Sequence, residues 1–167
     1  MEHKFNRDEE FRYEIEFANS QIELDVYRLL TILFSSKALH NANPPIYGFS
    51  MAAYQFERAE IYRIVFNLAI RARNILDKST GQTPSVALKS VGKIEEDDIL
   101  DELSFRESCN KIIHSEHINF GIIDPEDAIV HKGVTEFIYV YGKKSKKEWK
   151  ATIDLIKFSE TILQLNI

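Results

Sequence analysis

Residues 50–78, which read SMAAYQFERAEIYRIVFNLAIRARNILDK, decide the fold class that the sequence predicts. Their apolar residues recur every three or four positions and form one broad face, as in an amphipathic helix. Polar residues, among them Arg63, Asn67 and Arg71, form a second stripe at the same spacing. We interpret this stripe either as a solvated face with helical ion pairs or as a surface that faces a cleft or a dimer interface.

Three other blocks have helical character. Residues 7–40 carry an apolar stripe at the same spacing, although 11–17 also alternate in the manner of a strand. We favour a helix there because the three-four pattern continues past Ile22. Residues 96–116 begin with acidic residues, which stabilise a helix N-terminus through the macrodipole. Residues 156–165 predict a short closing helix.

Residues 136–155 differ from the rest of the chain. Two segments rich in β-branched and aromatic residues flank a polar run, which predicts a β-hairpin. The turn carries the lysines Lys143, Lys144, Lys146 and Lys147. We interpret them either as a soluble hairpin tip that discourages edge pairing or as a phosphate-contacting finger that binds the substrate.

Together these patterns predict a mainly α fold: a bundle of three long helices plus a C-terminal helix, with an accessory hairpin. The 167 residues suit one domain, and 21 Lys and Arg against 26 Asp and Glu give a formal charge of −5. A nucleic acid must therefore be held by a local patch. The first residues lack the apolar core of a secretory signal, and no apolar run approaches the ~20 residues that span a bilayer. We expect a cytoplasmic protein without membrane contact.

Residues 103–114, LSFRESCNKIIH, hold the candidate site. Arg106, Asn110 and His114 are four residues apart and His117 follows three later, so a helix would present all four on one face. Arg106 would hold a phosphate or stabilise charge in the transition state. His114 would transfer protons, and Asn110 would orient the imidazole or bind substrate. This chemistry needs no metal and no other cofactor.

The segment from Asn110 to His114 resembles the Asn-x-x-x-His half of the motif of the HEPN superfamily. That superfamily consists of small helical bundles, many of them ribonucleases of toxin–antitoxin, abortive-infection and CRISPR systems. The resemblance implies that residues 1–167 form a single HEPN-like domain with the hairpin inserted before its last helix. It also implies a metal-independent endoribonuclease of a defence or mobile-element system. The implied partners are RNA, a second copy in a homodimer, and an antitoxin or regulatory protein.

The HEPN motif has an arginine directly before its asparagine, where this chain has Cys109. Arg106 lies on the same predicted helical face, and Arg71 or Arg73 of the second block is another source of the missing guanidinium. The alternative function is a non-catalytic helical protein that uses this face for dimerisation or partner binding. In that case His114 would be a buried structural histidine.

Overall fold

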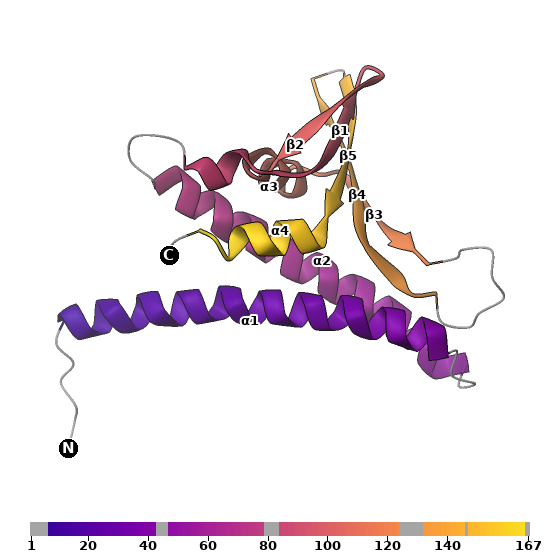
Figure 1. Cartoon of the computed structure of the whole chain (residues 1–167), viewed down its shortest axis with the longest axis horizontal. Coiled ribbons are helices and arrows are strands. Elements are labelled where there is room, and N and C mark those ends of the chain that lie inside the picture. Colours follow the sequence, from indigo (N-terminus) through magenta and orange to yellow (C-terminus); the bar gives the residue numbers. More distant parts are fainter. Residues whose placement is uncertain (1–6, 43–46, 79–83, 124–131, 146, 166–167) are drawn as a thin grey trace.

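Two long helices are followed by a five-stranded antiparallel sheet that carries two short helices (Figure 1). In chain order the elements are α1 (Arg7–Ala42), α2 (Tyr47–Lys78), the 3-10 helix η1 (Ser85–Leu88), β1 (Ser90–Glu96), β2 (Ile99–Ser104), α3 (Phe105–Ile113), β3 (His117–Ile122), β4 (Val134–Lys144), β5 (Lys147–Asp154) and α4 (Leu155–Ile162). This computed structural model describes residues 7–42, 47–78, 84–123, 132–145 and 147–165.

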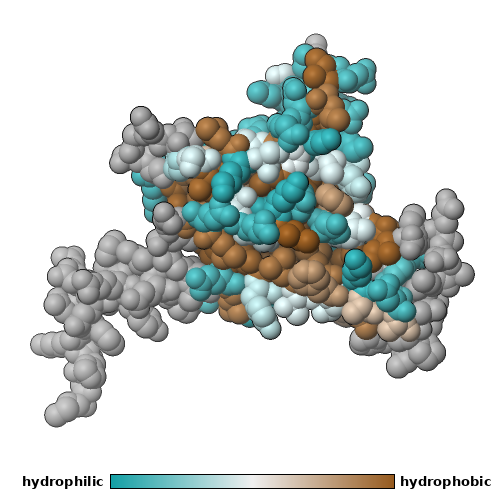
Figure 2. Space-filling model, in the orientation of Figure 1, coloured by the Kyte–Doolittle hydropathy of each residue, from teal (hydrophilic) through white to brown (hydrophobic). Residues whose placement is uncertain are grey.

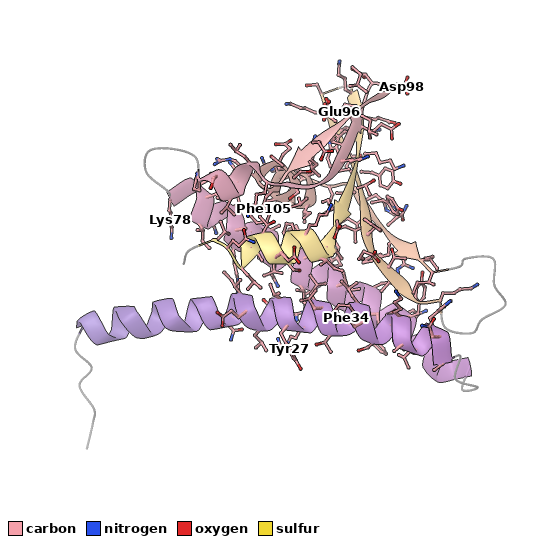
Figure 3. The ribbon with its side chains drawn as sticks, viewed as in Figure 1. Tyr27, Phe34, Lys78, Glu96, Asp98 and Phe105 are labelled. Carbon is pink, nitrogen blue, oxygen red and sulfur yellow. The ribbon has the colours of Figure 1, made fainter. Side chains whose placement is uncertain are left out.

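The prediction of a mainly α bundle is wrong, and the error lies in the block 96–116. That block contains the end of β1, all of β2 and then α3, in place of one long helix. Asp97 and Asp98 have positive φ angles of 53° and 64° and form the two-residue turn between β1 and β2. Both φ values match the type I′ turn that suits the twist of a hairpin, and aspartate tolerates this left-handed conformation. Figure 3 shows Asp98 at the tip of this hairpin.

The sheet has the strand order β2-β1-β5-β4-β3, with every neighbouring pair antiparallel. The predicted hairpin at 136–155 is found as the β4–β5 pair, but it is an integral part of the sheet and no accessory insertion. Gly142 lies opposite Trp149 in this pair. A Cβ atom on Gly142 would lie 2.3 Å from the Trp149 ring, so the indole takes the space that a side chain would need.

One face of the sheet forms the core. Ile138, Val140, Ala151 and Ile153 are buried on it, and the helices lie on this side of the sheet (Figure 1). Phe105 of α3 and Phe158 of α4 pack there with ring centroids 5.2 Å apart. Lys111 of α3 is also buried, with its Nζ atom 4.3 Å from the centroid of the Trp149 ring and 2.7 Å from Glu96 Oε1.

The two long helices confirm the helical prediction for their blocks, including residues 11–17, because α1 is continuous from Arg7. Leu29 of α1 and Leu68 of α2 are fully buried. The Ser36 hydroxyl joins α1 to α2 and to β4. It donates to Glu57 Oε2 of α2 and accepts from the backbone N–H of Val134, the first residue of β4, each at 2.8 Å. No helix of the described ranges has the length and apolarity that crossing a membrane requires.

The predicted closing helix corresponds to α4 (Leu155–Ile162). Asp154 caps its N-terminus, where the carboxylate accepts hydrogen bonds from the backbone N–H groups of Ile156 and Lys157, both at 3.0 Å. β5 therefore runs directly into α4, and Phe158 is placed back over the core face of the sheet.

Candidate functional site

The candidate site lies where α3 packs against α2. Ser104 begins α3 as its N-cap, with its hydroxyl accepting from the backbone N–H of Glu107 at 3.3 Å. Arg106 and Asn110 follow on the side of α3 that meets α2, as their contacts with α2 side chains show. His114 is the C-cap residue, and its backbone N–H donates to the Asn110 carbonyl at 3.0 Å.

A carboxylate of α2 bridges two guanidinium groups in this site. Asp77 Oδ2 accepts from Arg73 Nε and Asp77 Oδ1 accepts from Arg106, both at 2.7 Å. Arg73 also donates through its NH1 group to Asn110 Oδ1. The Asn110 amide in turn donates to Glu107 Oε2 at 3.2 Å. One connected network therefore holds both arginines and the asparagine in place.

In this network Asp77 stays ionised, and the two arginines keep N–H donors that these hydrogen bonds do not use. The hydrogen bond from Arg73, followed by the charges of Arg73 and Arg106, lowers the pKa of the Asp77 carboxyl below its ordinary value. The side chains of Arg73 and Arg106 are 29% and 34% exposed, so solvent reaches both. A guanidinium has five N–H donors, and each arginine uses fewer than five in the bonds described here, which leaves donors for an anion.

His114 ends the row that the sequence predicts. Its side chain is exposed, which contradicts the reading as a buried structural histidine. His117 is not part of the row, because α3 ends at Ile113 and His117 begins β3. The His117 ring instead forms a hydrogen bond of 2.8 Å between Nε2 and Asn119 Oδ1. The structure thus places Arg106 and Asn110 on α3 and His114 at its C-cap, and it places His117 on the sheet.

Arg71 lies away from the candidate site. Its NH1 group is 3.8 Å from Asp25 Oδ2, a buried carboxylate of α1 that also lies 3.7 Å from Arg28. Arg71 therefore faces α1, whereas Arg73, two residues later, faces α3. Of the two arginines considered as substitutes for the missing motif arginine, the structure brings Arg73 to Asn110.

The predicted lysine finger lies at the β4–β5 turn. Lys143 and Lys147 each pair with a carboxylate, Lys144 is exposed, and Lys146 lies outside the described residues. The local excess of positive charge that the sequence indicates is therefore reduced by acidic neighbours.

Two ion pairs account for this reduction. Lys143 Nζ is 3.1 Å from Glu148 Oε1 across the hairpin, and Lys147 donates to Asp97 at the tip of the neighbouring β1–β2 hairpin. Hydrogen bonding to Glu148 raises the pKa of Lys143, and hydrogen bonding to Asp97 raises the pKa of Lys147. Asp97 of the acidic run thus pairs with Lys147, and the run lies in β1, β2 and their turn instead of at a helix N-terminus.

Cys109, which occupies the position of the motif arginine, is fully buried. Burial raises the pKa of its thiol to about 12, so the thiolate is scarce near neutral pH. Among the residues that the structure describes, no three His, Cys, Asp or Glu side chains gather in a way that suits a metal ion.

Asp77 and Glu107 are the site residues that the sequence reasoning missed. Asp77 is four residues after Arg73 on α2, and Glu107 is three residues before Asn110 on α3. Both spacings put the partners on one helical face, so the signal was present in the sequence.

Comparisons with models of known protein families, with curated proteins and with solved structures give no match.

Proposed function

We propose that this chain is a metal-independent endoribonuclease whose site runs along α3 from Arg106 to His114. The observation that carries the proposal is the hydrogen bond from Arg73 to Asn110. It supplies from α2 the guanidinium that the HEPN motif places beside its asparagine, at the point where this chain has Cys109. Asp77 orients that guanidinium through Nε, and the N–H groups that these two bonds do not use would bind an anion.

The spacing of residues along α3 supports separate roles for the two arginines. His114, the C-cap of α3, is eight positions after Arg106, which is about 12 Å along the helix axis at 1.5 Å per residue. Asn110 and His114 are one turn apart, about 6 Å. In the proposed arrangement Arg73 and Asn110 hold the phosphate that is cleaved, His114 serves that phosphate, and Arg106 binds the neighbouring phosphate of the same RNA strand.

Cleavage proceeds by attack of a ribose 2′-hydroxyl on the adjacent phosphorus. His114 accepts the 2′-proton, the bond from phosphorus to the 5′-oxygen breaks, and that oxygen takes a proton from water. The products are a 2′,3′-cyclic phosphate and a 5′-hydroxyl end. Arg73 stabilises the added negative charge on the phosphoryl oxygens.

An RNA cleavage assay in EDTA tests this proposal. His114→Ala is expected to slow cleavage by about 10²- to 10⁴-fold, the usual contribution of a proton-transfer group. Arg73→Lys keeps the charge but removes the planar fork, so it is also expected to slow cleavage. Lys157→Ala, at an exposed position of α4, is the control that should cleave normally. Equal cleavage by the native chain and His114→Ala would contradict the proposal.

A second candidate function, partner binding by α1, is favoured by a separate observation. Leu24, Tyr27, Thr31 and Phe34 are all exposed, with Tyr27 at 68% and Phe34 at 62%. Their spacing of three, four and three is the seam pattern of two packed helices. Tyr27 projects from α1 away from the sheet (Figure 3), and the edge of α1 on that side is paler than the hydrophobic band that lies above it toward the sheet (Figure 2). We propose a second copy of α1 as the occupant.

Analytical ultracentrifugation tests the dimer. The native chain is expected to sediment as a dimer, and Tyr27→Lys combined with Phe34→Lys as a monomer, because charges in the seam would repel across the twofold axis. Tyr62→Lys is the matched control, since Tyr62 is an exposed aromatic residue of α2 outside the seam. A native monomer at high micromolar concentration would exclude this function.

A further inference from the structure

The face of the sheet opposite the helices carries a ladder of aromatic rings. Phe137, Tyr139 and Tyr141 are alternate residues of β4 and point to this face, because the residues between them, Ile138 and Val140, are buried in the core at 1% and 0% exposure. Phe137 is 36% exposed and the two tyrosines are partly exposed. The three rings therefore form a row on the open face of the sheet.

Polar and basic side chains flank this row on the two neighbouring strands. Tyr141 lies opposite Lys150 of β5 and opposite His117 of β3. The His117 and Tyr141 ring centroids are 6.0 Å apart, and Lys150 Nζ is 5.7 Å from the centroid of the Tyr139 ring. A hollow of about 490 Å³ lies beside Tyr141 and Lys150 on the side of β1, and its lining also includes the acidic residues Glu95, Asp97, Asp98 and Glu148. Tyr139 and Tyr141 thus have Lys150 and the His117 ring beside them, and the acidic hollow lies on the side away from β3.

We propose that this aromatic ladder binds single-stranded RNA, with unpaired bases stacked on Phe137, Tyr139 and Tyr141. Alternate residues of a strand are about 7 Å apart, so each ring serves one base of an extended, unstacked strand. Lys143, two residues beyond Tyr141 on the same face, and Lys150 contact the phosphates. Stacking of bases on aromatic rings tolerates any sequence, because every base has a flat π-face. The choice of RNA over DNA rests on the proposed function.

The carboxylates of the open face limit where the RNA lies and how tightly it binds. Glu95 of β1 lies opposite Lys150, and Glu102 of β2 lies opposite Lys93, so the β1–β2 side is acidic. The RNA therefore follows β4 and β3. Glu148 pairs with Lys143 at the end of the ladder and competes with a phosphate for that lysine. Binding is consequently weak and sensitive to salt.

The ladder ends beside the turn that carries His114. The backbone N–H of Glu116 donates to the Tyr141 carbonyl at 2.8 Å, which fixes the α3–β3 turn to β4 next to the last ring. His114 is two residues before Glu116, and His117 begins β3 one residue after it. An RNA strand stacked along β4 thus passes the α3–β3 turn, which carries His114, the proposed proton-transfer group.

Fluorescence anisotropy with a labelled 12-nucleotide RNA tests the ladder separately from cleavage. The RNA carries 2′-O-methyl groups, which remove the attacking hydroxyl and make it uncleavable, and salt is kept at 50 mM. The variants are Tyr139→Ala, Tyr141→Ala and Tyr141→Phe, with Tyr62→Ala on α2 as the control. A duplex of the same sequence and the corresponding single-stranded DNA serve as competing ligands.

We expect Tyr139→Ala and Tyr141→Ala each to weaken binding by about 5- to 100-fold, because each removes one stacked base. Tyr141→Phe and Tyr62→Ala should bind as the native chain does, and Glu148→Gln should bind more tightly because it frees Lys143. Absence of binding to the single strand, binding that the alanine variants leave unchanged, or a preference for the duplex or the DNA would each overturn the proposal. Binding that depends on the tyrosines without any RNA cleavage would uphold the ladder and refute the nuclease.

Discussion

The two faces of β4 and β5 come from the same stretch of chain but differ in what surrounds them. On the core face, Ile138 and Ile153 are almost wholly buried under α3 and α4. On the open face, Tyr139 and Thr152 are cross-strand neighbours that remain partly exposed. A shift of the register by one residue would exchange the two sets.

This difference separates stability from function within single strands. The burial of apolar side chains on the core face selects the register and supplies most of the favourable free energy. The open face is then free to carry rings and charges that the fold does not need. Substitutions at adjacent positions should therefore have very different consequences.

The largest effect is expected for Ile153→Ala on the core face. Ile153 is fully buried, so its truncation leaves a cavity and should lower the free energy of unfolding by about 2–5 kcal/mol. Thr152→Ala, its neighbour on the open face, should lower it by no more than about 1 kcal/mol. Urea denaturation followed by circular dichroism measures both, and similar losses at the two positions would contradict the assignment of Ile153 to the core face and Thr152 to the open face.

A smaller loss of stability is expected for Gly92→Ala in β1. A Cβ atom there would lie 2.0 Å from the backbone oxygen of Thr152, and a backbone atom cannot swing aside as a side chain can. Separating the strands to admit the methyl group should cost about 1–3 kcal/mol in thermal unfolding. Lys93→Ala, at the next and exposed position, is the control. Native stability of Gly92→Ala would mean that β1 lies further from β5 than described.

Smaller still is the expected cost of removing the rings of the open face. Tyr139→Ala and Tyr141→Ala each lose cross-strand contacts, typically worth about 0.2–1 kcal/mol. Both variants should fold with the native circular dichroism spectrum, so that RNA binding can be measured on them. A loss as large as that of Ile153→Ala would show that this face is packed against something in solution.

The smallest effect concerns the ion pair at the end of the ladder. Glu148 raises the pKa of Lys143, so the pair stabilises the fold below the ordinary lysine pKa of 10.5 and loses this contribution as the pH rises through the raised value. Glu148→Gln should return the Lys143 pKa toward 10.5, as measured by NMR titration of the lysine side chain. High salt should weaken the shift in the native chain, since both side chains are exposed.

The sequence predicted the helices in which the apolar spacing continues over many residues and the hairpin whose turn is marked by a run of polar residues. α2, α1 and α4 follow from their apolar spacing, and the β4–β5 hairpin follows from two β-rich segments around a polar turn. The block 96–116 failed because acidic residues suit both a helix N-terminus and the Asp97-Asp98 turn. Spacing within the block does not show that the chain reverses there. The strand conformation at the start of this block is selected by the tertiary pairing of β1 with β5.

The candidate site was partly predictable for a similar reason. The spacing of Arg106 and Asn110 placed them on one face of α3, and that is local geometry. The contact of Asn110 with Arg73 rather than Arg71 depends on how α2 rotates against α3, which one sequence does not encode locally. His117 does not share a helical face with Asn110, because α3 ends at Ile113. The sequence marks the end of a helix poorly where glycine is absent.

The strand order also has a consequence for the way the chain folds as it is synthesised. β5 pairs with both β1 and β4, so it joins a β1–β2 hairpin and a β3–β4 hairpin that are otherwise separate. Isolated two-stranded pieces are at best marginally stable in water. Until residues 147–154 have emerged from the ribosome, the nascent chain therefore holds two unjoined hairpins beside its long helices. The sheet is complete only when this second-last element of the chain has been made, and the pairing of β1 with β5 joins strands that are far apart in the sequence.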